Sequence, residues 1–414
     1  MHYRKTVCFS HLAGNRFDSR LCRIDEQGTM AIQETVEVPE KVCDVPQQQT
    51  GKSAVETQAV PFVGDVASPE EKGVRELLRN YDGTRVPEYY IKPENMRKDS
   101  TPINVDPEAA KNTLPVIDLS APHEELVEAI GKACRWGFFQ IINHGTDPTL
   151  LKKIAAETEE FFFLPLEEKI RCTTPQKVSG PIHFGGGSSG DWRDVLKINC
   201  APPSAVAMDC WPERPVGFRE TLLQYVTEQD KLMMRLMAVI SESLGLEPDY
   251  IAKECTDPRA LLALNHYPPS PEPSLTMGIR EHSDPSTITI LLQDQVAGLQ
   301  LFKDGKWFDV QSVENALVIN AGDHLQIVSN GRYPSCLHRV VNNKLQSRTS
   351  IALFYSPALT AKIKPAPELV DEEHPPQYVE FTYGDFVKNF YKIGGPNKKV
   401  VLQHYQTGQY ESKA

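Results

Sequence analysis

The chain has 414 residues, and its 44 Lys and Arg against 55 Asp and Glu give a formal net charge of −11. Its 40% hydrophobic and 24% charged residues are ordinary for a globular protein of one large domain or two smaller ones. The acidic balance excludes a typical nucleic-acid binder, because nonspecific affinity comes from cations that neutralise phosphates. No apolar run approaches the roughly 18 residues of a membrane span. We therefore expect a soluble protein without a nucleic-acid or membrane partner.

The nine cysteines form no C-x-x-C pair and no regular framework. We interpret them as reduced thiols, which favours a cytoplasmic location. Residues 1–67 differ from the rest, because their basic, acid-poor start is followed by an acidic stretch. They lack the apolar core of a secretory signal, although organelle targeting stays open. We expect a mobile N-terminal extension, since the segment shows little apolar periodicity.

From residue 68 to 250 the pattern predicts a mainly helical part. Ser68-Pro69 is typical of a helix start, and short strands are expected at 114–119 and 137–143, each followed by a helix. Apolar residues at three-to-four spacing predict a long helix from Phe218 to Leu246.

From residue 251 to 405 the period changes to that of strands. Five short runs rich in β-formers are expected as strands, and Asp304-Gly305 indicates a hairpin. The runs cover residues 287–292, 298–302, 306–310, 316–319 and 349–354. A helix is expected again at 383–391, and residues 406–414 form a tail. Many short strands with flanking helices predict an α+β fold built on a sandwich or barrel.

Three residues suggest a metal site. His282-Ser283-Asp284 is expected at the start of a strand, where a period of two puts His282 and Asp284 on one face. His338 follows at the head of another apolar run. Two imidazoles and one carboxylate can occupy one face of an octahedral Fe(II) and leave three positions for small ligands. An H-x-D pair alone is weak evidence for a metal site, since most such pairs have a structural role.

A second pair of residues strengthens this hypothesis. Arg348 and Ser350 have period-two spacing within a predicted strand, so both side chains point to one side. An arginine inside a barrel is costly unless it meets an anion. A dicarboxylate cosubstrate would bind the metal through its keto-acid end and Arg348 through its far carboxylate.

Residues 68–405 resemble the plant-type iron(II)/2-oxoglutarate-dependent dioxygenases. The motifs that carry the resemblance are Trp136 to Gly145 (WGFFQIINHG), Phe162 to Lys169 (FFLPLEEK), Asp191 to Asp194 (DWRD), His282 to Pro285 (HSDP), Ser329 to Tyr333 (SNGRY) and His338 to Val340 (HRV). The resemblance implies a distorted double-stranded β-helix, or jelly roll, with flanking helices. It also implies iron on His282, Asp284 and His338.

The cosubstrate site is likewise implied by the resemblance. It places 2-oxoglutarate on Arg348 and Ser350, with Tyr267 donating to a carboxylate and Asn265 helping at the same end. No catalytic residue is expected beyond the metal ligands. The implied cofactors are Fe(II), 2-oxoglutarate and O2, with ascorbate as reductant, and the implied state is a monomer.

The implied reaction hydroxylates or oxidises a small plant-type specialised metabolite or hormone precursor, with succinate and CO2 as co-products. Residues 294–300 and 335–339 are similar to gibberellin-type diterpenoid oxidases, whereas 282–294 and 383–390 are closer to phenylpropanoid and coumarin-forming hydroxylases. The substrate therefore stays open. Two alternatives are a related iron oxidase that does not consume 2-oxoglutarate, and a noncatalytic small-molecule receptor on the same fold.

Overall fold

The computed structural model describes residues 22–24, 30–32, 73–80, 84–97, 114–171, 182–183, 190–202, 206, 208, 211–393 and 398–408. Contacts between Cα atoms divide the chain into Met1–Val63 and Gly64–Ala414. In the first unit, β1 (Cys22–Ile24) pairs antiparallel with β2 (Met30–Ile32). The helix start expected at residue 68 and most of the expected extension lie outside the described residues, so the predicted division into parts stays a prediction. No described helix is long and apolar enough to cross a membrane.

The larger of the two main sheets in Gly64–Ala414 has eight strands in the order β3-β4-β12-β9-β14-β7-β6-β5. The pair β3–β4 is parallel and the other pairs are antiparallel, so the sheet is mixed. Its strands are β3 (Val116–Asp118), β4 (Phe138–Ile142), β5 (Ile182–His183), β6 (Asp194–Ala201), β7 (Arg259–Tyr267), β9 (Ile288–Gln293), β12 (Leu317–Ala321) and β14 (Arg348–Ser356). Four of them come from before residue 251, so both predicted parts of the dioxygenase contribute strands to this sheet.

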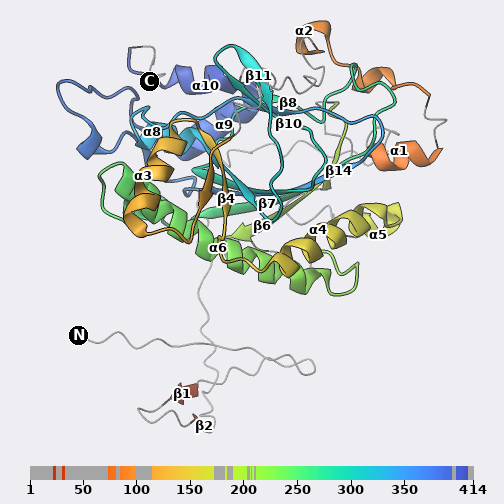
Figure 1. The fold of residues 1–414 in the computed structure, drawn as a ribbon, viewed down its shortest axis with the longest axis horizontal. Helices are drawn as coiled ribbons and strands as arrows, with labels where there is room; N and C mark the ends of the chain where they lie inside the picture. Colours follow the sequence, from red (N-terminus) through yellow and green to blue (C-terminus); the bar gives the residue numbers. More distant parts are fainter. Residues whose placement is uncertain are drawn as a thin grey trace, which may run out of the picture. The chain divides into compact units, whose positions relative to one another are not determined.

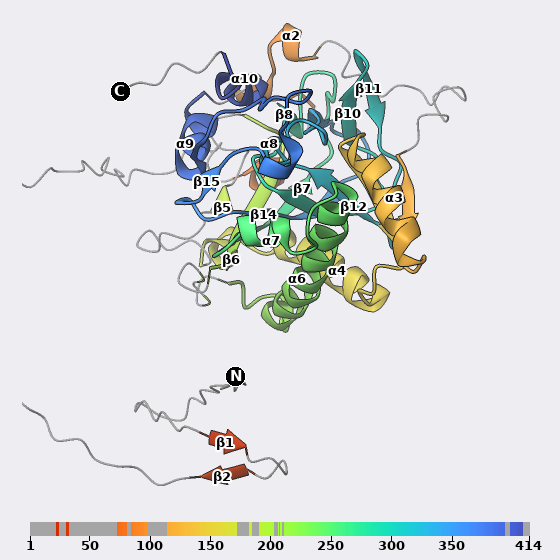
Figure 2. The ribbon, with the colours of Figure 1, turned by 90° about the vertical axis from the view of Figure 1, so that its left-hand side faces the viewer.

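A smaller four-stranded sheet lies across the larger one, as Figures 1 and 2 show. Its order is β11-β10-β13-β8. The strands are β8 (Ile279–His282), β10 (Leu299–Lys303), β11 (Lys306–Asp309) and β13 (His338–Val340). The turn between β10 and β11 contains Asp304 and Gly305 at positive φ, which confirms the predicted hairpin. Together with the helices, the two facing sheets confirm the predicted α+β fold, and over the described residues they do not close into a barrel.

Helices cover the outer face of the larger sheet (Figure 1). They are α3 (His123–Cys134), α4 (Pro148–Phe163), α6 (Phe218–Ser243) and α7 (Tyr250–Glu254). Apolar residues from these helices and from the outer faces of the strands form the main hydrophobic core. The long helix predicted at 218–246 is α6, and Gly245 follows it at a φ of +80°. Because these helices cover the outer face of the sheet, polar residues of the sheet lie on its inner face.

Shorter elements complete the second unit. They are α1 (Val74–Asn80), the 3-10 turn Glu88–Tyr90, α2 (Glu94–Arg97), α5 (Leu166–Ile170), α8 (Asp323–Val328), β15 (Lys362–Ile363), the 3-10 turn Pro367–Leu369, β16 (Phe381–Thr382), α9 (Tyr383–Ile393) and α10 (Lys398–His404). The last helix predicted from the sequence is α9, which packs with α10 in a separate aromatic cluster. The helix α10 was not expected.

Residues 191–194 connect residues 73–97 to the sheet. The carboxylate of Asp194 accepts hydrogen bonds of 2.8 and 3.0 Å from the first two backbone N–H groups of α1. Asp191 forms a buried ion pair of 2.9 Å with Lys92. Between them, the Trp192 indole is fully buried and donates to a backbone carbonyl at 3.2 Å. Trp192 is therefore a core residue.

Candidate active site

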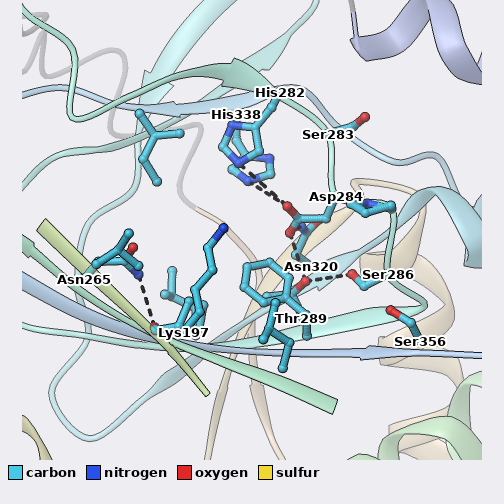
Figure 3. Close-up of a pocket in the computed structure, with 18 of the residues that line it drawn as sticks. Lys197, Asn265, His282, Ser283, Asp284, Ser286, Thr289, Asn320, His338 and Ser356 are labelled. Carbon is cyan, nitrogen blue, oxygen red and sulfur yellow. Dashed lines mark hydrogen bonds and ion pairs between the residues drawn. The ribbon is translucent and has the colours of Figure 1, made fainter. Parts of the chain in front are cut away.

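Three potential metal ligands converge in the space between the two sheets. Ligand atoms of His282, Asp284 and His338 all lie within 4.8 Å of one another. Both histidine Nε2 atoms are 3.7 Å from Oδ1 of Asp284 (Figure 3). One cation between these atoms could contact two imidazoles and a carboxylate, the ligand set typical of non-haem Fe(II). Within the described ranges, no other group of His, Cys, Asp or Glu meets this criterion.

The hydrogen bonds of the two imidazoles prepare them for a metal. Nδ1 of His282 lies 2.8 Å from the carbonyl of Arg280, and Nδ1 of His338 lies 3.2 Å from that of Cys336. A carbonyl only accepts, so each Nδ1 carries the proton and each Nε2 keeps its lone pair. This is the outer contact that fixes the tautomer and orientation of metal-binding histidines.

The carboxylate of Asp284 is fixed by two residues of the larger sheet. Its Oδ2 accepts from Thr289 Oγ1 at 2.9 Å and from Asn320 Nδ2 at 2.6 Å. The other oxygen, Oδ1, is therefore the one that faces the histidines. Asp284 is only 4% exposed, so these hydrogen bonds offset the desolvation of a buried charge. The sequence analysis did not identify either supporting residue.

The local backbone differs from the prediction at Asp284. His338 lies directly opposite His282 in the β13–β8 register, and the ring centroids are 4.1 Å apart. However, β8 ends at His282, and Asp284 lies in the following loop. The expectation that His282 and Asp284 share one strand face is therefore wrong. The loop turns Asp284 toward the histidines, and its carbonyl accepts from the backbone N–H of Asp323 at 2.7 Å.

The four residues proposed for the cosubstrate form two adjacent cross-strand pairs. In the β14–β7 register, Arg348 lies opposite Tyr267 and Ser350 opposite Asn265. All four line the same cavity as the metal candidates. The period-two spacing within each strand places them on one face of the sheet, as expected.

The guanidinium of Arg348 has hydrogen-bonding capacity for an anion. Arg348 is 2% exposed, and its Nη2 donates to Gln293 at 2.8 Å. In the part of the chain that the structure describes, its buried Nε and Nη1 have no hydrogen-bond partner. Leaving charged donors buried and unsatisfied is costly, so the site fits a ligand carboxylate that could accept from both.

Asn265 is held by the protein itself. Its Oδ1 accepts from Arg193 at 2.8 Å, and its Nδ2 lies 3.2 and 3.4 Å from the carbonyls of Ala263 and Ser350. Through these hydrogen bonds, Asn265 holds the neighbouring strands and Arg193 in place at the cosubstrate end.

Three other buried histidines, His144, His266 and His324, have structural surroundings. His144 follows the end of β4, and its Nε2 lies 3.0 Å from the carbonyl of Asn315. His266 points to the opposite face from the cavity and stacks on Phe162, with centroids 5.5 Å apart. Both His266 and His324 are fully buried, and burial lowers the pKa of each to about 3. They are therefore neutral packing residues at ordinary pH.

The cavity that contains both candidate sites has a volume of about 850 Å³. Sites for small molecules are typically concave and a few hundred to a thousand Å³ in size. Strands of both sheets and residues of α9 line it, including Lys197 of β6, which the sequence analysis missed. A non-haem iron oxygenase on a double-stranded β-helix is the class of protein that this fold and site define.

Comparison with known proteins gives the family. Residues 258–357 match the 2OG-Fe(II) oxygenase superfamily, and residues 114–214 match the N-terminal region of the non-haem dioxygenase in morphine synthesis. The chain is 38% identical over 330 residues to flavanone 3-dioxygenase 2 of Oryza sativa subsp. japonica, covering 78% of this chain and 95% of that protein. The chain belongs to the 2OG-Fe(II) oxygenase superfamily.

Other relatives agree in fold and reaction type. Feruloyl CoA ortho-hydroxylase 1 of Arabidopsis thaliana is 35% identical over 365 residues, which is 85% of this chain and 96% of that protein. A crystal structure of JOX2 in complex with 2OG, Fe and JA is similar with a TM-score of 0.71 and 33% identity, over 80% of this chain and 97% of that one. The protein is therefore a 2-oxoglutarate-dependent dioxygenase that uses Fe(II) and 2-oxoglutarate, and the predicted jelly-roll fold is confirmed.

Proposed function

We propose that this dioxygenase oxidises a small plant-type specialised metabolite or hormone precursor, of the diterpenoid or the phenylpropanoid and flavonoid classes. We further propose that His282, Asp284 and His338 hold the iron, and that Arg348, Ser350 and Tyr267 bind 2-oxoglutarate. The observation that carries the proposal is a buried arginine with two unsatisfied donors in the wall of the cavity that also contains the three convergent metal ligands.

When bound, iron and 2-oxoglutarate supply an oxidation coupled to the release of succinate and CO2, with O2 as oxidant and ascorbate as reductant. The chain's own residues supply binding and orientation. Arg348 holds the far carboxylate of the cosubstrate, and the Tyr267 hydroxyl donates to the same end. Thr289 and Asn320 keep Asp284 turned toward the two imidazoles.

The experiment compares wild type with His282→Ala and with His123→Ala as a matched control. His123 is a largely exposed histidine whose Nε2 pairs with Glu242 on the outer surface. Each purified protein receives Fe(II), ascorbate and 2-oxoglutarate, together with diterpenoid acids, flavonoids and cinnamoyl thioesters in turn. Metal content, succinate and oxidised product are measured.

We expect wild type and His123→Ala to bind metal and to form succinate in step with one product class. His282→Ala should lose both properties and keep its circular dichroism spectrum. Full succinate formation by metal-stripped His282→Ala would overturn the iron assignment. Product formation without succinate would instead favour the related oxidase that does not consume 2-oxoglutarate.

A further inference from the structure

We propose that Lys197 binds a carboxylate of the substrate, so that the substrate class is an organic acid rather than a neutral molecule. This inference rests on the proposed function, because it concerns the same cavity and the same reaction. It adds a specificity-determining residue that belongs to neither the metal set nor the cosubstrate set.

The alternation of β6 directs Lys197 into the cavity. Its neighbours Leu196 and Ile198 belong to the main hydrophobic core on the helix side of the sheet. Lys197 therefore lies on the opposite face, where it is half-buried and lines the cavity. Figure 3 shows its side chain rising from β6 toward the space that His338 and Asp284 face.

The neighbours of Lys197 on the inner face are small. Lys197 lies opposite Ala263 in the β6–β7 register, and Ala263 lies opposite Ala352 in the β7–β14 register. Because the two alanine side chains are single methyl groups, they fill little of the space above the middle of the sheet. Among these three residues the lysine has the long side chain, and the space above the alanines is available to a ligand.

The position of Lys197 separates it from the far end of the cosubstrate. Arg348 is four residues from Ala352 along β14, which corresponds to about 13 Å along the strand. The row with Asn265 and Ser350 lies between Arg348 and the row of Lys197. The two cations thus arise from different rows of the sheet, so Lys197 is suited to a second anionic group.

The charges around the cavity favour an acid. Among the described residues of its lining, the basic side chains are Arg193, Lys197, Arg259, Arg280, Arg348 and Lys388, and the carboxylates are Asp191 and Asp284. Asp191 is ion-paired with Lys92, and Asp284 is proposed as a metal ligand. After the cosubstrate is assigned to Arg348, positive charge predominates in the lining. In a partly water-excluded site such charge attracts an anion and gives no comparable gain to a neutral substrate.

The test uses three acids, each beside its primary amide: cinnamate, a gibberellin-type diterpenoid acid and benzoate. Wild type, Lys197→Met and Lys197→Arg are loaded with Mn²⁺ and 2-oxoglutarate under anaerobic conditions, and each probe is titrated by calorimetry. Lys152→Met is the control, because Lys152 is a largely exposed lysine paired with Glu314. Dissociation constants for Mn²⁺ and 2-oxoglutarate are measured first.

We expect at least one acid to bind wild type about tenfold or more tightly than its amide, the effect of one charge-assisted hydrogen bond. Lys197→Met should lose this preference without a change in 2-oxoglutarate affinity, whereas Lys197→Arg and Lys152→Met should retain it. The proposal is wrong if no acid binds wild type more tightly than its amide. It is also wrong if Lys197→Met weakens 2-oxoglutarate binding and leaves the acid preference intact. If wild type fails to bind Mn²⁺ or 2-oxoglutarate, the proposed function fails before any probe is added.

Discussion

The two sheets contribute to the active site in different ways. The smaller sheet provides the two histidines, one at the end of β8 and one at the start of β13. The larger sheet provides the cosubstrate candidates from the long strands β7 and β14. The histidines are positioned by strand ends and a loop, whereas the cosubstrate residues lie within a continuous ladder of nine paired residues. A metal site assembled at strand ends depends on packing between sheets more than the cosubstrate site does.

Asp284 joins the two halves. It follows a strand of the smaller sheet, and its Oδ2 is held by Thr289 of β9 and Asn320 of β12 in the larger sheet. The difference between the sheets therefore predicts that substitutions can alter cosubstrate affinity and metal affinity separately. Changes in β14 should alter cosubstrate affinity, and changes at the contacts to Asp284 should alter metal affinity.

The largest effect is expected for Arg348→Met. The change removes two donors available to a carboxylate, each worth roughly 1.5–3 kcal/mol, so 2-oxoglutarate affinity should fall about a hundredfold or more. Metal affinity should be unchanged, and Arg348→Lys should lie between wild type and Met because it keeps the charge without the planar fork. Calorimetry measures the Mn²⁺ affinity on the metal-free protein and the 2-oxoglutarate affinity on the Mn²⁺-loaded protein. Unchanged cosubstrate affinity would break the assignment of this strand.

A smaller effect on the other half of the site is expected for Asn320→Ala. Loss of the 2.6 Å hydrogen bond to Asp284 should lower metal affinity by about 10- to 100-fold, the usual effect of removing an outer-shell partner. The control is Asn389→Ala, whose amide donates to Tyr405 in the C-terminal aromatic cluster. Competition with a metal chelator gives the affinities. Equal affinities for the two variants would argue against support from the larger sheet.

Gly298→Ala offers a gentler change at the cosubstrate end. A Cβ at this position would lie 2.9 Å from Cδ of Arg348 and 3.1 Å from the carbonyl of Val341, so the arginine must move. We expect KM for 2-oxoglutarate to rise by about tenfold, equivalent to roughly 1.4 kcal/mol, with unchanged metal affinity. Steady-state succinate measurements test this. If Gly298→Ala keeps the wild-type KM for 2-oxoglutarate, the displacement of Arg348 does not affect cosubstrate binding.

The last effect concerns the stability of the fold and leaves the candidate site unchanged. His266 and His324 have a pKa of about 3 when folded, whereas an unfolded histidine titrates near pH 6.5. Between these values the unfolded chain binds more protons. The free energy of unfolding should therefore fall as pH drops from about 6.5 toward 3, by up to about 1.4 kcal/mol per pH unit for each histidine. Urea unfolding of the metal-free His266→Gln protein should give a shallower pH slope than wild type, and an equal slope would contradict the prediction.

Residue spacing predicted the parts of the site that lie within one strand. Arg348 and Ser350 face the same way because the alternation of β14 is uninterrupted between them. The same argument failed for His282 and Asp284, since alternation has no meaning after a strand ends. The opposition of His282 and His338 depends on the register between β8 and β13, which spacing along the chain does not encode. The residue types suggested a metal site and the family resemblance supported it, but neither predicts the register that places the two imidazoles opposite each other.

The strand β6 shows another limit of pattern reading. Its residues alternate as a strand should, but the polar positions Lys197 and Asn199 face an internal cavity instead of solvent. Without the fold, these residues give no sign of a site. The helix α10 was missed for a similar reason, because its seven residues derive their order from the aromatic cluster on which they pack.

The alternation of side chains along residues 191–194 limits which insertions and deletions the protein tolerates. Asp191 and Arg193 face the cavity side, whereas Trp192 and Asp194 contact the core and the start of α1. Because successive side chains point in opposite directions, deletion or insertion of a single residue here would exchange the two sets. The buried ion pair with Lys92, the contact of Arg193 with Asn265 and the cap on α1 would then be lost together. Relatives should therefore keep the length of this segment.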